Sequence, residues 1–157
     1  MVEERLCELG LSLPPIFQLP SGMRINLAFA KRCGNLLYVS GQGPSDGQRM
    51  VYQGKVGREL SVEEGYAAAR LTALNILRIV QEELGSLDAV QSWVKVLGFI
   101  NSAPGFNQQP AVLNGFSDLI VDLYGEQRGR HARSAVGIAE LPFDVPVEIE
   151  AILEIGA

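Results

Sequence analysis

The sequence predicts an α+β fold in which one mixed sheet carries two helices on one of its faces. Two long stretches, residues 61–84 and 107–124, repeat apolar side chains at helical spacing. Five shorter segments have the length and composition of strands. Their order is β-β-α-β-α-β-β, and 157 residues suffice for a single domain with a sizeable core.

The chain begins with a segment that we expect to lie outside this sheet-and-helix unit. Residues 2–10 are predicted to form a short helix, because Leu6 and Leu9 share one side and Gly10 follows them. Three prolines then keep the chain extended. We therefore expect the N-terminal extension, residues 1–20, to pack across the domain surface.

The first strands and the first long helix have local signals at their ends. Segments 25–31 and 36–40 are predicted strands, joined by a turn at Gly34-Asn35. Ser61 is a good N-cap, and the glutamate three residues later completes a capping box for the helix. Gly85 is the expected end of that helix.

The second half of the chain continues the alternation. An apolar run at 91–100 predicts a strand, and the helix at 107–124 has Pro110 early, where its missing N–H does least harm. Two final strands are expected at 133–140 and 146–155. The LPFDVP segment between them indicates a turn, so we expect these two strands to lie side by side as a hairpin.

Charge and composition exclude several classes of protein. The net charge of −5 argues against nucleic-acid binding as the main function, because phosphate contacts require a basic surface. A short basic cluster formed by Arg128, Arg130, His131 and Arg133 suits a small anion better than a polymer. We expect no membrane span and no secretory leader, hence a cytoplasmic protein.

Cysteine and histidine usage gives no sign of a metal centre. Cys7 and Cys33 lack metal-ligand spacing, and His131 is the only histidine. We therefore expect reduced thiols and no metal.

Two charged residues stand out because they lie in strand-like segments near the C-terminus. Arg133 begins one segment and Glu148 lies within the next. A charge in a half-buried strand is costly unless it has a partner. The two could pair with each other or face water, or Arg133 could hold a carboxylate through its planar fork of donors.

Several segments together resemble the RidA/YjgF family, formerly called the endoribonuclease L-PSP family. The resemblance spans about residues 24–155 and is carried by GNLLYVSGQGP, GKVGRELSVEEGYAAARLTALNIL, WVKVLGFINSAPGF, VLNGFSDLIVDLYG, and HARSAVGIAELP followed by VEIEAI. It implies a chorismate-mutase-like fold and a homotrimer with a ligand cleft at each interface. The N-terminal extension and the form GRHARSAVG indicate a divergent branch.

The resemblance also implies roles for particular residues. Arg133 would hold the substrate carboxylate, with a backbone group at Ala135 as a second contact. Glu148 would be the catalytic residue that orders a water. Glu150 is its rival, because side chains two apart share a strand face.

Four further residues match pocket positions of the family. Ser40 and Gly41 match the pocket floor, although Gly41 could simply serve the backbone of a strand end. Asn114 matches a pocket-facing helical asparagine, whereas most helical asparagines lie on the surface. His131 could donate to an anion or relay a proton, or could be a surface loop residue.

The function implied is hydrolysis of a 2-imino or 2-enamino acid to a 2-oxo acid and ammonia, with no cofactor. One departure counts against turnover: Leu27 stands where many family deaminases carry a tyrosine. The alternative is a binding or regulatory module with the same cleft. The older ribonuclease label is disfavoured by the acidic charge and by the lack of an aromatic basic face.

Overall fold

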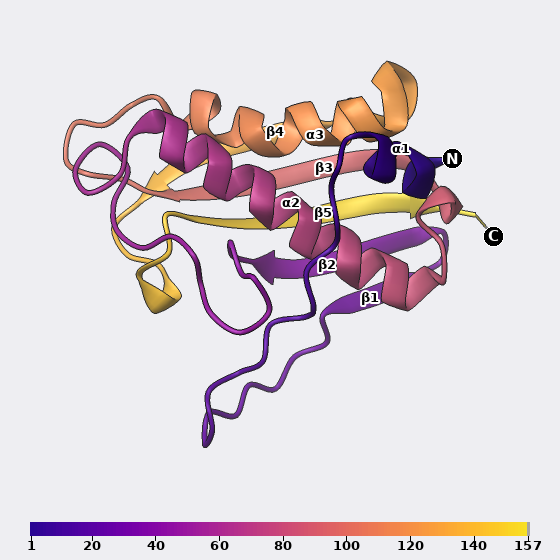
Figure 1. Cartoon of the computed structure of the whole chain (residues 1–157), viewed down its shortest axis with the longest axis horizontal. Coiled ribbons are helices and arrows are strands. Elements are labelled where there is room, and N and C mark those ends of the chain that lie inside the picture. The colour runs from indigo at the N-terminus through magenta and orange to yellow at the C-terminus, as the bar shows by residue number, and fades with distance from the viewer. Residues whose placement is uncertain (157) are drawn as a thin grey trace.

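Two long helices lie beside each other across one face of a five-stranded sheet (Figure 1). The computed structural model describes residues 1–156. Its helices are α1 (Val2–Glu8), α2 (Val62–Leu84) and α3 (Gln109–Gly129), with short 3-10 turns η1 (Leu87–Ala89) and η2 (Pro142–Asp144). Its strands are β1 (Ala30–Cys33), β2 (Leu36–Gln42), β3 (Val90–Asn101), β4 (Ala132–Ile138) and β5 (Val147–Ile155). The predicted α+β class and element order are confirmed.

The sheet is mixed, and its strand order is β1-β2-β5-β3-β4. All neighbours pair antiparallel except β3 and β4, which are parallel. The predicted hairpin between the last two strands is therefore wrong, because β3 lies between β4 and β5. The LPFDVP segment does bend, through left-handed Phe143 (φ 57°) and Asp144 (φ 55°), but it carries the chain past β3 to the centre of the sheet.

The ends of α2 follow the predicted signals. The Ser61 hydroxyl accepts from the Glu64 N–H, and the Glu64 carboxylate accepts from the Ser61 N–H. Gly85 ends the helix in the left-handed conformation, at φ 79°. Local side-chain chemistry is sufficient to place both ends of this element.

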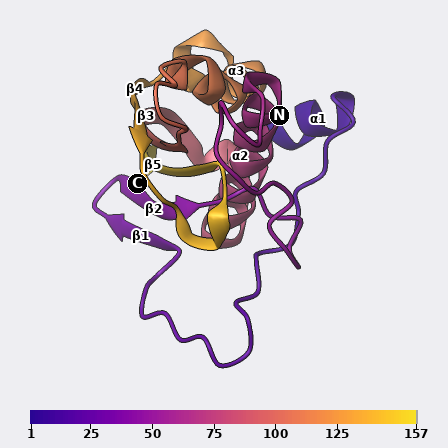
Figure 2. The same cartoon turned by 90° about the vertical axis from the view of Figure 1, so that its left-hand side faces the viewer.

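The core lies between the two long helices and the sheet. Its largest fully buried side chains include Trp93, Phe116, Ile149 and Leu153. Close helix contact depends on Gly115, where an added Cβ would lie 2.0 Å from the Tyr66 carbonyl oxygen. The second face of the sheet carries no helix, as the turned view shows (Figure 2).

The N-terminal extension packs as expected over its first part. Leu9, Leu11, Leu13 and Ile16 are partly buried against the core. The guanidinium of Arg78 on α2 donates to the carbonyls of Leu13 and Pro14 and fixes the extended chain to the helix. Residues 18–29 are exposed and extend away from the sheet, so strand β1 begins only at Ala30, later than predicted (Figure 1).

No helix among residues 1–156 combines the length and apolarity needed to cross a bilayer. Both cysteines, Cys7 and Cys33, are exposed free thiols.

Candidate functional site

Arg133 lies at the start of β4 and turns its side chain toward α3. Its guanidinium donates to Ser117 Oγ (3.0 Å), Asn114 Oδ1 (2.8 Å) and the Pro110 carbonyl (3.3 Å). Arg133, Ser117 and Asn114 border a cavity of about 560 Å³, which we call the arginine pocket. It is lined by Asn114, Ser117, Asp118, Val121, Asp122, Glu126, Arg130, His131 and Arg133.

His131 contacts the same hydroxyl as Arg133. Its Nε2 lies 2.9 Å from Ser117 Oγ, and its Nδ1 lies 2.7 Å from the Gly129 carbonyl oxygen. The ring is mostly buried, with Phe116 packed edge-on against it. Burial lowers the pKa of His131, and the charge of Arg133 lowers it further, against the raising effect of the Gly129 carbonyl.

Glu148 lies in a second, more apolar cavity of about 280 Å³, which we call the glutamate pocket. It is lined by Phe17, Leu19, Ile25, Leu27, Phe29, Gly41, Gln42, Gly43, Met50, Pro142, Phe143, Val145 and Glu148. Burial raises the pKa of Glu148, and the neighbouring Glu150 raises it further. Gly41 leaves room for this side chain, because an added Cβ there would lie 3.0 Å from Glu148 Cδ.

Arg133 and Glu148 lie on opposite faces of the sheet. Arg133 is in register with Val96, which is buried beneath the helices. Glu148 is in register with Phe99, three residues further along β3, on the face without helices. Side chains alternate along a strand, so one chain cannot direct both residues at one small ligand. The two residues do not pair with each other either, since the contacts of Arg133 are neutral oxygens.

The other residues singled out from the sequence divide between these places. Asn114 and His131 join Arg133 in the arginine pocket, and Gly41 joins Glu148. Ser40 lines neither cavity; its hydroxyl donates to the Ala28 carbonyl (2.6 Å) and holds the strand against the extended segment. Ala135 follows Arg133 on β4 and is partly buried against the core.

Glu150 shares its strand face with Glu148, as predicted, but is exposed. Leu27 lines the glutamate pocket and is 50% exposed. An apolar side chain therefore occupies the part of this pocket where the resemblance would place a phenol.

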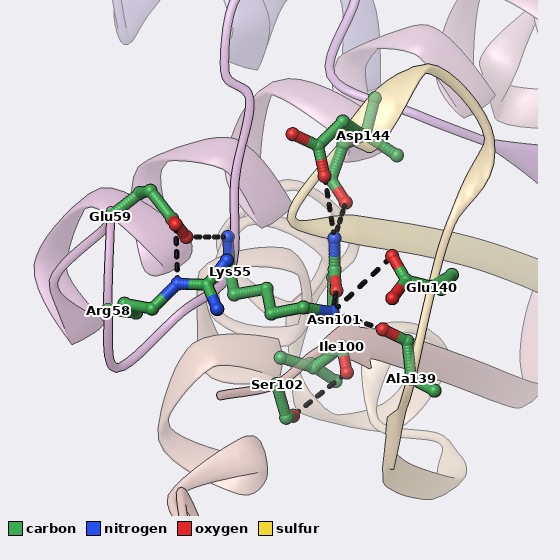
Figure 3. Close-up of polar contacts among 10 residues, drawn as sticks. Lys55, Arg58, Glu59, Ile100, Asn101, Ser102, Ala139, Glu140 and Asp144 are labelled. Carbon is green, nitrogen blue, oxygen red and sulfur yellow. Dashed lines mark hydrogen bonds and ion pairs between the residues drawn. The ribbon is translucent and has the colours of Figure 1, made fainter. Parts of the chain in front are cut away.

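A polar cluster formed by Lys55, Asn101 and the β4–β5 connection fixes one wall of the glutamate pocket (Figure 3). The Lys55 ammonium donates to Asn101 Oδ1 (2.6 Å) and to the Ala139 carbonyl. The amide of fully buried Asn101 donates to the Val145 carbonyl (3.2 Å) and to Asp144 Oδ1 (3.4 Å). The Lys55 side chain is only 12% exposed and all its contacts are within this cluster, so its role is to hold the loop.

Sequence reasoning did not identify Ser117, although a signal for it existed. Asn114, Ser117 and Val121 are spaced by three and four residues and therefore share one face of α3. To predict that this polar face lies next to Arg133, one would have to know that β4 packs against α3.

Among residues 1–156, no group of three or more His, Cys, Asp or Glu side chains is placed to hold a metal ion.

Comparison with known proteins identifies the family. The family model described as "YjgF/chorismate_mutase-like, putative endoribonuclease" matches residues 3–148. The chain belongs to the RidA/YjgF family. The chorismate-mutase-like fold expected from the sequence resemblance is confirmed.

Three relatives align over nearly the whole chain. Protein TCP17 of Trypanosoma cruzi is 42% identical over 155 residues, 99% of this chain and 94% of its own length. The Agrobacterium tumefaciens protein Atu1372, of unknown function, is 44% identical with a TM-score of 0.89, covering 99% and 92% of the two chains. A putative endoribonuclease from Shewanella oneidensis MR-1 is 30% identical with a TM-score of 0.91, covering 99% of both. The N-terminal extension therefore aligns with these relatives too.

Proposed function

We propose that this RidA/YjgF protein binds a small 2-oxo, 2-imino or 2-enamino carboxylate and hydrolyses the imine form to a 2-oxo acid and ammonia. Arg133 holds the carboxylate, and Glu148 positions the attacking water or shuttles its proton. The reaction needs no cofactor, because the imine carbon is already electrophilic. The observation that carries this proposal is the environment of Arg133.

Arg133 is partly buried, yet its hydrogen-bond partners are all neutral oxygens. They fix the guanidinium plane without neutralising its charge. Within residues 1–156 no carboxylate lies within ion-pair distance of it, and nearby Asp118 instead accepts from the Tyr66 hydroxyl (2.8 Å). A fixed guanidinium that has no ion-pair partner in the described part of the chain and borders a cavity can bind an anion through the N–H groups that these three contacts leave free.

Glu148 has the properties needed for proton transfer. Its half-buried position raises its pKa toward the range in which a carboxyl group can both take up and release a proton. The close approach allowed by Gly41 directs the carboxyl group into the glutamate pocket. Backbone groups near Gly41 and Ala135 would orient the ligand.

We further infer a homotrimer whose interface clefts bring together the arginine pocket of one copy and the glutamate pocket of the next. Two observations support it: the two residues face opposite ways in one chain, and the helix-free sheet face exposes apolar side chains. Tyr38 is 43% exposed and Val136 40%. Apolar side chains on an open sheet face favour burial against another subunit.

The exposed free thiols of Cys7 and Cys33 favour a reducing compartment, and we place the protein in the cytoplasm on that ground.

A second candidate function is ligand binding without turnover. Leu27 supports it, because an apolar side chain in the glutamate pocket offers no proton to the reacting imine. Ribonuclease activity is disfavoured by the acidic side chains of Asp118, Asp122 and Glu126 in the arginine pocket, which would repel a polyanion.

Calorimetric titration with 2-oxobutyrate tests carboxylate capture by Arg133. Arg133→Lys keeps the charge but loses the planar fork, and we expect binding to weaken by about 1.5–3 kcal/mol, the worth of a charge-assisted hydrogen bond. Arg130→Lys is the matched control. Arg130 lines the same pocket, but its Nη1 forms an ion pair with Glu126 Oε2 at 3.5 Å, whereas Arg133 has no carboxylate partner among residues 1–156. Equal losses in the two variants would contradict a specific role for Arg133.

A further inference from the structure

Ser117, His131 and Gly129 form a continuous hydrogen-bonded chain that ends on Arg133. A carbonyl oxygen only accepts, so the Gly129 carbonyl requires that His131 Nδ1 carry the ring proton. In the neutral ring Nε2 is then a free acceptor, and the Ser117 hydroxyl 2.9 Å away donates to it. The remaining lone pairs of Ser117 Oγ accept from Arg133.

This arrangement is that of an activated hydroxyl. A serine hydroxyl bonded to a histidine, whose second nitrogen is held by a fixed acceptor, can pass its proton to the ring. Arg133 places a positive charge 3.0 Å from the oxygen and stabilises negative charge that develops there. The hydroxyl also borders the arginine pocket, next to the position of a carboxylate bound by Arg133.

The surroundings keep the ring available as a base. Burial is the main reason that the pKa of His131 lies below its ordinary value of 6.5. Of the charged groups that line this pocket, Arg130 and Arg133 disfavour the protonated ring, whereas Asp118, Asp122 and Glu126 on α3 favour it. The lowered pKa leaves the imidazole neutral near pH 7.

We propose that Ser117 and His131 are the proton-transfer pair of the arginine pocket and supply the hydroxyl function that Leu27 lacks in the glutamate pocket. This inference rests on the proposed function and adds the group that acts on the water or the imine. Ser117 touches the reacting atoms, and His131 acts through it.

The step balances without a further reactant. The water oxygen forms a bond to C2 of the imino acid, and the C=N π electrons move to nitrogen. The water proton goes to Ser117 Oγ as the serine proton moves to His131 Nε2. The pair then returns that proton to nitrogen, which gives a neutral carbinolamine. The proton of the C2 hydroxyl then passes through the pair to nitrogen as the C=O bond forms and the C–N bond breaks, so that ammonia leaves and a 2-oxo acid remains.

The first test compares Ser117→Ala, Ser117→Thr and His131→Asn in ammonia release from freshly generated 2-aminoacrylate. We expect Ser117→Ala and His131→Asn to lower kcat on the order of 100-fold, the usual contribution of one proton-transfer group. Ser117→Thr retains the hydroxyl and should recover part of the rate. Gln127→Ala, at an exposed position of α3 outside the pocket, is the control and should keep the native rate.

Binding of 2-oxobutyrate separates this role from a structural one. All four variants retain Arg133 together with its contacts to Asn114 and the Pro110 carbonyl. Their dissociation constants for 2-oxobutyrate should therefore stay within about threefold of native, less than about 1 kcal/mol. Unchanged kcat in both Ser117→Ala and His131→Asn would overturn the pair. Covalent labelling of Ser117 by a fluorophosphonate together with ester hydrolysis would also overturn it, in favour of a serine nucleophile.

A second reaction decides the case in which the native protein releases no ammonia. Exchange of the C3 hydrogens of 2-oxobutyrate with deuterated water also needs a proton acceptor beside an Arg133-bound carboxylate. If the native protein catalyses exchange and both Ser117→Ala and His131→Asn abolish it, the pair stands while the deaminase proposal falls. If the native protein catalyses neither reaction, the pair is refuted as well.

Discussion

Mixing two inactive variants tests whether Arg133 and Glu148 act in one site built from two copies of the chain. Arg133→Ala removes the proposed carboxylate contact and leaves Glu148 in place, and Glu148→Gln does the converse. Because the two side chains lie on opposite faces of the sheet, neither variant can repair its own site. In a mixed assembly, however, an intact Arg133 can meet an intact Glu148 across an interface.

The expected recovery follows from this geometry. When equal amounts of both variants assemble at random, a site is complete only if one copy retains Arg133 and its neighbour retains Glu148. In a trimer that contains both variants, one neighbouring pair out of three meets this condition, so about a third of native activity should return in the mixed assemblies that carry both tags.

The assay is ammonia release from 2-aminoacrylate by co-expressed variants carrying two different tags and purified through both. Controls are each variant alone and a mixture of separately purified variants that have not exchanged subunits. Activity no greater than that of the single variants would refute the shared site, provided that native protein carrying both tags is active.

Three further changes have defined outcomes. Gly115→Ala places a methyl group 2.0 Å from the Tyr66 carbonyl oxygen, and should lower the free energy of unfolding in urea by about 3 kcal/mol or more because backbone must move. Leu27→Tyr adds a phenol to the glutamate pocket and should raise deaminase kcat, by less than the roughly 100-fold of an optimised proton donor; a slower enzyme would show that the phenol is not needed. Burial lowers the pKa of His131, so its contribution to stability is complete above pH 6.5 and is lost as the pH falls through the pKa of the folded state. NMR of this single histidine should show a titration midpoint below pH 6.5. His131→Asn should flatten the fall in unfolding free energy toward pH 5.5.

The parts of the fold that local chemistry determines could be predicted from the sequence. The Ser61 capping box and Gly85 mark the ends of α2, and Gly34 gives the turn between β1 and β2. Strand partners depend instead on contacts between distant segments. The prolines around Phe143 indicate a bend, but only the tertiary fold places β3 between the two final strands.

The same distinction separates the predicted and the missed parts of the site. Family resemblance selected Arg133 and Glu148, but their directions depend on strand register, which alternates with each residue. Their division between two pockets was therefore beyond sequence reasoning. Ser117 was missed because its neighbours His131, just before β4, and Arg133, in β4, lie 14 and 16 residues away in the chain.

Ammonia release from freshly generated 2-aminoacrylate, measured with native protein, with Arg133→Lys and with buffer alone, tests whether this protein hydrolyses imines with Arg133 as its carboxylate anchor. We expect the native protein to release ammonia faster than buffer does. Arg133→Lys should lose most of this excess rate while its unfolding free energy stays near native. A native rate equal to buffer, or an Arg133→Lys rate equal to native, would contradict the claim that this protein is an imine hydrolase with Arg133 as its carboxylate anchor.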